Sequence, residues 1–367
     1  MYNIVTCISV DQDKTGGKVK YPNIGTENKN RKHVYWRCAY TFCAASVKVN
    51  PEKKHIVVTN DLEEIIIDNI NVKDELAGLG VTIIYLDFDR FDPGKHSMRF
   101  RNAFYKLQVI ERLAQETLPS LLLDSDILWH KKDVVLDDIM SSGEYLVLQD
   151  TYQRSNKPLE KLHNISMKDM GDLYRLIGIQ GYNQPYPIWY GGELIGGSPQ
   201  TLGKVAKNIL ELLNYCKEED NKGNKFLFPN GNSIFDGDEF ISSYVYNSMD
   251  VKIYDSYNRH IKRLWTAEVY NNVSEGDENI PIWHLISEKG TGLKQLFYES
   301  VNPDSEFWNC TDFTEYLGKY VGIPKRNFKD KSSTVKSGDL IYDQLRFLNS
   351  RRKRLKWWYY MRFKKRR

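Results

Sequence analysis

The amino-acid sequence predicts an α/β fold, a layered sheet with helices on both of its faces. Two observations lead to this prediction. Short apolar runs rich in Val, Ile and Leu recur through about the first 150 residues, as is typical of buried parallel strands. Between them lie segments in which apolar residues recur every three or four positions, the period of an amphipathic helix. Because strands that alternate with helices pack as layers, a sheet covered by helices follows.

The elements are expected in the following order. Strands are predicted at 4–10, 55–59, 81–86, 120–123 and 145–148, each a short apolar run. A helix is predicted over 102–115, because Phe104, Leu107 and Ile110 fall on one helical face. Residues 151–190 are polar and irregular, which predicts a long ordered loop or a small subdomain. A helix at 201–216, a second helix from about residue 238, and strands at 251–254 and 280–284 complete the prediction.

Length and composition fit one large domain with an appendage. The chain has 367 residues, of which 41% are hydrophobic and 27% charged, the composition of a globular protein. We expect a folded domain at 1–326, a linker at 327–339, where the residues are mostly polar, and a helical basic tail at 340–367.

Cysteine usage and the N-terminal sequence indicate in which cellular compartment the protein is expected. The five cysteines lack CxxC spacing, which predicts reduced thiols in a cytoplasmic compartment. No signal-peptide pattern and no apolar stretch of spanning length is seen. Any membrane contact is therefore expected to be peripheral, on the inner face of the plasma membrane.

The tail combines positive charge with aromatic residues. Residues 351–367 contain ten Lys or Arg and no acid, whereas the rest of the chain has 42 basic and 48 acidic residues. Four consecutive aromatics occupy 357–360. Tyr and Trp favour the depth of lipid headgroups, and each Lys or Arg near an anionic leaflet contributes about 1 kcal/mol. We therefore expect binding to an anionic membrane surface and favour it over two alternatives, binding of single-stranded nucleic acid and docking back onto the protein.

One acidic motif stands out by its context. Asp124 and Asp126 follow an apolar strand and precede further apolar residues, so their carboxylates are costly to bury unless they are paired or bind a metal. Two carboxylates at this spacing can share one divalent ion, which in turn neutralises a diphosphate. The same spacing occurs at 11/13, 87/89 and 236/238, so the motif alone is weak. The pair at 87/89 is expected to be a solvated turn.

Taken in order, five segments of the chain resemble the motifs of a known enzyme family. They are Phe104-Tyr-Lys-Leu, Leu121-Leu-Leu-Asp-Ser-Asp-Ile, Trp189-Tyr-Gly-Gly-Glu, Asp236-Gly-Asp-Glu-Phe and Ile282-Trp-His. This order resembles that of the GT-A glycosyltransferases related to glycogenin and to bacterial lipooligosaccharide galactosyltransferases. The resemblance spans roughly residues 1–295 and implies a GT-A-like, Rossmann-like sheet.

The resemblance also implies a metal site. It assigns Asp124, Asp126 and His284 as ligands, and imidazole with carboxylates suits Mn²⁺, or Mg²⁺ as the alternative. A lone histidine after a strand can equally be structural.

Several residues would bind the donor by the same resemblance. Lys106 would meet the sugar phosphate together with Asp124, although it could also be a solvated helix lysine. Gly191 and Gly192 would let the backbone approach the donor sugar, or they could form an ordinary turn. Lys289 would reach the diphosphate. The family has its glycine and lysine at other offsets after the histidine, so Lys294 competes for this role.

Asp236, Asp238 and Glu239 are the candidate catalytic acids. The family carries an amide where Gly237 stands here, so the retaining mechanism that the resemblance favours is not secured. In an inverting reaction, Asp238 or Glu239 would be the general base. Either acid could instead be a helix N-terminal charge that the helix dipole favours.

The sequence thus predicts a metal-dependent glycosyltransferase, a hexosyltransferase. It would move a sugar from a nucleotide diphosphate donor, most simply a UDP-sugar, to a glycan or lipid-linked glycan during lipooligosaccharide or capsule assembly. One alternative is a sugar nucleotidyltransferase, which shares a similar sheet but opens with a Gly-rich basic loop that 11–17 matches poorly. The other is a non-enzymatic adaptor that binds membrane or nucleic acid through the tail.

Overall fold

A computed structural model of the chain describes residues 1–10, 31–97, 99–142, 145–149, 152–153, 157–158, 161–162, 164–250, 252–266 and 271–324, together with residues 345, 348, 352 and 355. The pair Asp11/Asp13, the predicted linker and nearly all of the predicted tail lie outside the described residues.

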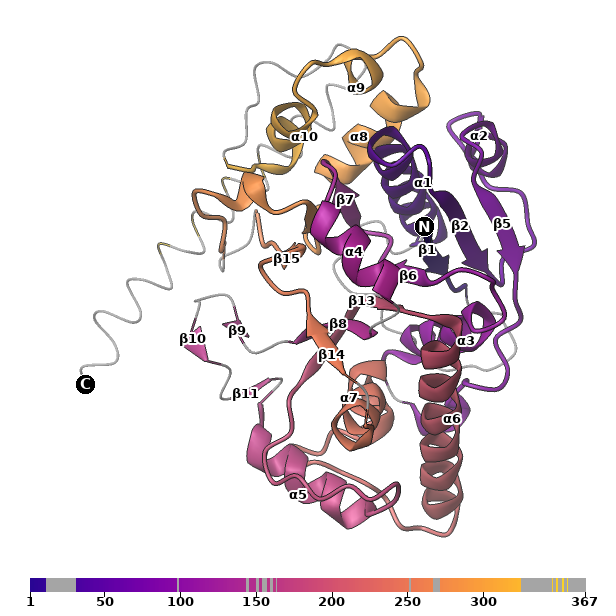
Figure 1. Cartoon of the computed structure of the whole chain (residues 1–367), viewed down its shortest axis with the longest axis vertical. Helices are drawn as coiled ribbons and strands as arrows, with labels where there is room; N and C mark the ends of the chain where they lie inside the picture. Colours follow the sequence, from indigo (N-terminus) through magenta and orange to yellow (C-terminus); the bar gives the residue numbers. More distant parts are fainter. Residues whose placement is uncertain are drawn as a thin grey trace.

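A seven-stranded sheet forms the centre of the molecule (Figure 1). Its strands run in the order β14 (Ile253–Asp255), β8 (Tyr145–Gln149), β13 (Tyr190–Gly197), β6 (Ser120–Leu123), β1 (Asn3–Ile8), β2 (Lys54–Thr59) and β5 (Thr82–Tyr85). Pairing is parallel from β6 to β5 and between β14 and β8. The expected parallel strands are therefore present. The sheet is nevertheless mixed, because β13 runs antiparallel to both β6 and β8.

Helices cover both faces of this sheet, as predicted. Successive strand residues point to opposite faces, so Leu121 and Leu123 belong to one core while Leu122 belongs to the other. The first core packs under α1 (Arg31–Val49), α2 (Val72–Gly78), α4 (Val134–Ser142), α8 (Gly292–Val301), α9 (Glu306–Asn309) and α10 (Phe313–Val321). The second packs under α3 (Tyr105–Leu113), α5 (Met167–Ile177), α6 (Pro199–Asn221) and α7 (Asp238–Ser248).

A smaller sheet brings distant parts of the chain to the end of β6. It has the order β15 (Ile261–Arg263), β16 (Ile282–His284) and β7 (Ile127–Trp129). The chain leaves the large sheet at β6 and enters the small one at β7, so Asp124 and Asp126 lie in the connection. His284 is paired with Ile127 across the small sheet, and its neighbour Leu285 donates its backbone N–H to the carbonyl of Asp126 at 2.8 Å.

The segment 151–190 is more structured than expected. It contains α5, whose N-cap Ser166 forms a capping box with Asp169 and which ends at Gly178 with φ of 65°. The remaining short elements are β3 (Ile66–Ile67), β4 (Ile70–Asn71), β9 (Tyr152–Gln153), β10 (Lys157–Pro158), β11 (Lys161–Leu162), β12 (Ile165–Ser166), η2 (Gly94–His96), η3 (Arg101–Phe104), η4 (Ile234–Asp236) and η5 (Asp277–Asn279).

Few tail residues are described. Residues 345, 348, 352 and 355 are helical, and Leu345, Leu348 and Leu355 among them are exposed. Within the described part of the chain, every helix is too short or too polar to cross a bilayer. All five cysteines are described and are free thiols, as predicted.

Candidate active site

The three predicted metal ligands meet where β6 gives way to β7. Asp124 begins this connection, and its backbone N–H donates to the carbonyl of Glu193 on β13 at 3.0 Å. His284 places Nε2 at 3.8 Å from Asp124 Oδ2 and at 3.5 Å from Asp126 Oδ2. One ligand atom from each of the three side chains lies within 4.8 Å of the others. Two carboxylates and an imidazole at this separation fit a divalent cation such as Mn²⁺.

Lys289 forms an ion pair with Asp126 at the same place, and both side chains are buried. Burial alone would raise the pKa of Asp126, but the ammonium of Lys289 and the ring of His284 outweigh it and hold that pKa far below its usual range. Lys289 lines the cavity described below, whereas Lys294 lies on α8 and is not among the lining residues. Of the two lysines that compete for this role in the sequence, Lys289 is the one at the cavity.

Lys106 extends from α3 into the site and is no solvated helix lysine, because its side chain is only 12% exposed. Its Nζ donates to the backbone carbonyl of Gly192 at 2.6 Å and lies 2.6 Å from Asp124 Oδ1 and 3.9 Å from Asp238 Oδ2. Burial would lower the pKa of Lys106, but Asp124 and Asp238 raise it far above its usual value. The side chain therefore stays a cation at every physiological pH.

Gly192 is placed where a larger residue would collide with functional groups. A Cβ at this position would lie 2.8 Å from Asp238 Oδ2 and 3.1 Å from Lys106 Nζ. Gly191 is buried on the same strand but does not line the cavity. Of the two predicted glycines, only Gly192 borders the space that a ligand could fill.

The three predicted acids occupy different surroundings. Asp236 accepts a hydrogen bond from the backbone N–H of Ser233 at 3.0 Å in a capping box, so it has a structural role. Glu239 accepts from the indole N–H of Trp189 at 3.2 Å and from the backbone N–H of Gly192 at 3.3 Å. Asp238 is buried beside Lys106, and burial raises its pKa above the usual aspartate value. Asp238 is therefore a buried acid next to a lysine at the wall of the cavity.

Two further charged residues belong to the site and have no counterpart in the sequence-based prediction. Glu193 is 1% exposed on β13 and accepts from Arg263 on β15 through Nε at 2.7 Å and Nη2 at 2.8 Å. Its Oε1 also lies 3.3 Å from Nδ1 of His284. Burial opposes ionisation of Glu193, but Arg263 and His284 hold its pKa well below the usual range. The sequence carried two signals for Glu193: it ends the resembling segment Trp189-Tyr-Gly-Gly-Glu, and it is the one charged residue of its strand.

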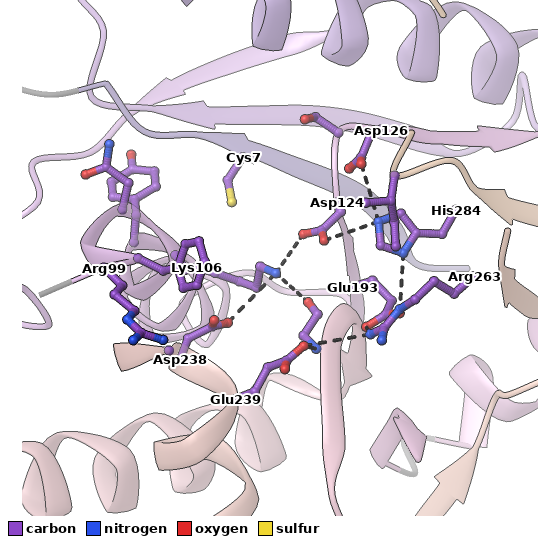
Figure 2. Close-up of a pocket in the computed structure, with 18 of the residues that line it drawn as sticks. Cys7, Arg99, Lys106, Asp124, Asp126, Glu193, Asp238, Glu239, Arg263 and His284 are labelled. Atoms are coloured by element: carbon purple, nitrogen blue, oxygen red, sulfur yellow. Dashed lines mark hydrogen bonds and ion pairs between the residues drawn. The ribbon is translucent and has the colours of Figure 1, made fainter. Parts of the chain in front are cut away.

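These residues line one cavity of about 540 Å³, a size typical of small-molecule sites (Figure 2). The labelled side chains converge on it from both sheets and from α3 and α7. Its aromatic lining includes Tyr35, Tyr105, Trp189, Tyr257 and Trp265. By contrast, Asp87 and Asp89 are exposed in the loop after β5, as expected for a solvated turn.

The chain was compared with family models, curated proteins and solved structures. No family model and no curated protein matches the chain. Among solved structures, the galactosyltransferase LgtC in complex with donor and acceptor sugar analogues is 12% identical, with a TM-score of 0.44 over 87% of this chain and 96% of that one. The bifunctional glycosyltransferase WbbM is 9% identical, with a TM-score of 0.46 over 84% of this chain and 50% of that one. Mouse xyloside xylosyltransferase 1 is also 9% identical, with a TM-score of 0.43 over 77% of this chain and 96% of that one.

The solved structures named above are glycosyltransferases, the class whose ordered motifs the sequence resembles. At these scores and identities, the activity has to be inferred from the site itself.

Proposed function

We propose that this chain is a metal-dependent glycosyltransferase that moves a sugar from a nucleoside diphosphate donor to a glycan acceptor. One observation carries the proposal: Asp124, Asp126 and His284 converge within 4.8 Å of one another in a cavity that also holds Lys106 and Lys289. Two carboxylates and an imidazole hold a cation, and two lysines beside them suit a ligand with several negative charges. A nucleoside diphosphate sugar has this charge pattern.

Each charged residue of the cavity has a proposed role in binding the donor. A divalent cation held by Asp124, Asp126 and His284 would neutralise the diphosphate as it leaves. Lys289, next to Asp126, adds a second positive charge on that side of the cavity. Lys106 contacts both Asp124 and the carbonyl of Gly192, so it fixes these two parts of the cavity lining relative to each other. The donor sugar would lie between them. These fixed charges need no rearrangement when negative charge develops on the leaving group.

Asp238 is the carboxylate that we assign to the reacting centre. Its Oδ2 lies 3.9 Å from Nζ of Lys106. The same oxygen faces the position that a Cβ of residue 192 would occupy, so it can contact a group bound next to Gly192. In a retaining reaction, which we favour, an ionised Asp238 stabilises positive charge on the sugar carbon. In an inverting reaction it would accept the proton of the acceptor hydroxyl, a role that suits its raised pKa.

The acceptor would lie against the aromatic wall of the cavity. Trp189, Tyr257 and Trp265 line it, and flat aromatic rings pack against the apolar faces of sugars. We propose a glycan or lipid-linked glycan of a surface polysaccharide or lipooligosaccharide. The basic aromatic tail would hold the enzyme on the inner face of the plasma membrane, where such acceptors are assembled.

Product analysis tests the proposal against the sugar nucleotidyltransferase alternative. Purified protein is incubated with UDP-sugars and Mn²⁺, with and without a glycan acceptor. A glycosyltransferase releases UDP, slowly from donor alone and faster with acceptor. Formation of sugar 1-phosphate on addition of pyrophosphate would favour the nucleotidyltransferase, and no turnover of any donor would favour the adaptor.

A further inference from the structure

We propose that Glu193 is a positioning residue that fixes the ring of His284 so that Nε2 faces the candidate metal site. The inference rests on the proposed metal-dependent function and goes beyond its ligand set. Glu193 lies on β13, whose eight residues are all buried. Its side chain faces two neighbouring strands of the small sheet, where Arg263 of β15 and the residue paired with it, His284 of β16, both contact its Oε1 (Figure 2).

The distances around the ring assign a role to each nitrogen. Nδ1 lies 3.3 Å from Oε1 of Glu193, and Nε2 lies 3.5 Å from Asp126 and 3.8 Å from Asp124. A carboxylate is an acceptor only, so Nδ1 must carry the proton in this contact. Nε2 is then the nitrogen that faces the two aspartates, and it would be the one to bind a cation held between them. A carboxylate behind a histidine commonly orients such ligands in metal sites.

The backbone supports this placement. The register between β13 and β8 shifts between Gly191 and Ile195, so Glu193 lies within an irregular stretch of the strand. Irregularities of this kind often re-aim a side chain beside an active site. On the other edge of β13, Asp124 donates its N–H to the carbonyl of Glu193 at 3.0 Å. Glu193 therefore contacts the candidate ligand Asp124 through its backbone and the candidate ligand His284 through its side chain.

Arg263 completes the arrangement and explains why a carboxylate is tolerated here. Its guanidinium binds Glu193 through two nitrogens and lies 3.8 Å from Oε1 of Glu239. The two-pronged contact fixes the plane of the Glu193 carboxylate, and hence the direction of the oxygen that faces His284. A purely structural alternative is that Glu193 serves only as the partner of Arg263 and that its contact with His284 is incidental.

Four variants separate the two alternatives: Glu193→Gln, Glu193→Leu, Arg263→Gln and the double change Glu193→Leu with Arg263→Met. The readouts are the Kd for Mn²⁺ by isothermal titration and the midpoint of thermal unfolding. We expect Glu193→Leu to weaken Mn²⁺ binding by about 10- to 100-fold, and Glu193→Gln, which retains an acceptor, to weaken it less. Arg263→Gln should lower thermal stability and weaken Mn²⁺ binding less than Glu193→Leu does, because Glu193 keeps its own contact with His284.

The double variant decides between positioning and structure. It removes both partners of the ion pair, so neither charge is left without the other, and its thermal stability should recover relative to either single change. Its Mn²⁺ affinity should stay as low as that of Glu193→Leu, because His284 still lacks its acceptor. Wild-type Mn²⁺ affinity in the folded double variant, or in Glu193→Leu, would overturn the inference. If Mn²⁺ binds to the wild type and His284→Ala weakens it, the proposed metal site stands whichever way Glu193 behaves, whereas absence of Mn²⁺ binding to the wild type contradicts both.

Discussion

At the scale of single residues, the candidate site is a chain of alternating charges. Lys289 contacts Asp126, His284 lies between Asp126 and Glu193, and Arg263 lies beyond Glu193. Buried charges are costly unless they are paired, so each member depends on its neighbours. Substitutions here therefore change both function and stability, and the two effects have to be measured separately.

Asp126→Asn should abolish metal-dependent donor hydrolysis or transfer, because it removes a ligand charge. It also leaves Lys289 buried without its carboxylate, so we expect a loss of stability of about 3–5 kcal/mol. Turnover with Mn²⁺ and urea unfolding measure the two effects. Asp124→Asn is the matched comparison, because its side chain is 28% exposed and its stability loss should be smaller. Near-normal turnover by folded Asp126→Asn would remove Asp126 from the site.

Gly192→Ala should reduce kcat by at least about tenfold while the protein stays folded. The new Cβ would approach Asp238 and Lys106 to within 2.8 and 3.1 Å, so one of these side chains must move. Gly78→Ala is the control, because a Cβ there meets nothing within 4 Å. Equal kcat for the two variants would show that Gly192 is not part of the reacting region.

Single residues were predictable from the sequence where a motif or an ordered resemblance marked them. Asp124, Asp126, His284, Lys106 and Lys289 were found in this way and do lie together. Glu193 lies in one of the resembling segments but received no role, and Arg263 lies in none of them, because the two form a pair only across about 70 residues of sequence. Only the pairing of strands brings the two together.

At the scale of elements, the small sheet holds the site together. His130, just after β7, lies with its ring centroid 3.9 Å from that of Trp283 on β16. Its Nε2 contacts the carbonyl of Ile280 at 2.7 Å, and its Nδ1 contacts Thr314 Oγ1 on α10 at 2.8 Å. Because His284 follows Trp283 directly, these contacts also support the candidate metal ligand.

His130 should make stability fall at mildly acidic pH. Burial lowers the pKa of His130 to about 3, against about 6.5 in the unfolded chain. The folded state therefore excludes a proton that the unfolded state accepts, so the stabilisation is complete above about pH 6.5 and is lost as pH falls toward 3. Between about pH 6.5 and pH 5, the expected loss is about 1–2 kcal/mol. Urea unfolding should show a smaller pH dependence for His130→Gln, and an unchanged dependence would contradict this assignment.

Most strands of the large sheet could be predicted from the sequence because they are short, apolar and bounded by polar residues. The central strand β13 was not predicted, because half of its residues are glycine. Several helices were also not predicted, among them α1 and α5. Nearly all of the middle of α1 is buried, so it shows little of the periodicity that marks a one-sided helix. α5 has helical periodicity at Met170, Leu173, Tyr174 and Ile177 and end signals at Ser166 and Gly178, but it lies in a segment whose other residues are polar and irregular.

At the scale of the whole molecule, the cavity opens where the large and small sheets meet. The predicted linker follows α10 in the sequence. Among the residues that the structure describes, those that line the cavity all precede residue 290. The division into a catalytic domain at 1–326 and a tail at 340–367 remains a prediction. Under it, every described residue that lines the cavity belongs to the catalytic domain.

Truncation after Lys336 should leave donor turnover intact and abolish sedimentation with anionic vesicles. The removed segment contains the ten cations of residues 351–367, so binding by the full chain should fall steeply as salt rises. The aromatic run should retain part of the binding at high salt, because burial of apolar surface is not screened. Equal vesicle binding by both forms would exclude the tail as an anchor. Tight binding to RNA but not to vesicles would favour the nucleic-acid alternative.

The central claim is that Asp124, Asp126 and His284 hold a cation through which a nucleotide sugar binds. The most direct test is a thermal unfolding series with a panel of nucleotide sugars, each with Mn²⁺ and with a chelator, on the wild type and on His284→Ala. A ligand that binds the folded state stabilises it by about 2.7 kcal/mol at a hundredfold excess over its Kd. We predict that at least one nucleotide sugar raises the unfolding midpoint of the wild type in Mn²⁺, and that this increase is largely lost with the chelator and in His284→Ala. No increase with any nucleotide sugar, or the same increase with the chelator and in the variant, would contradict the claim.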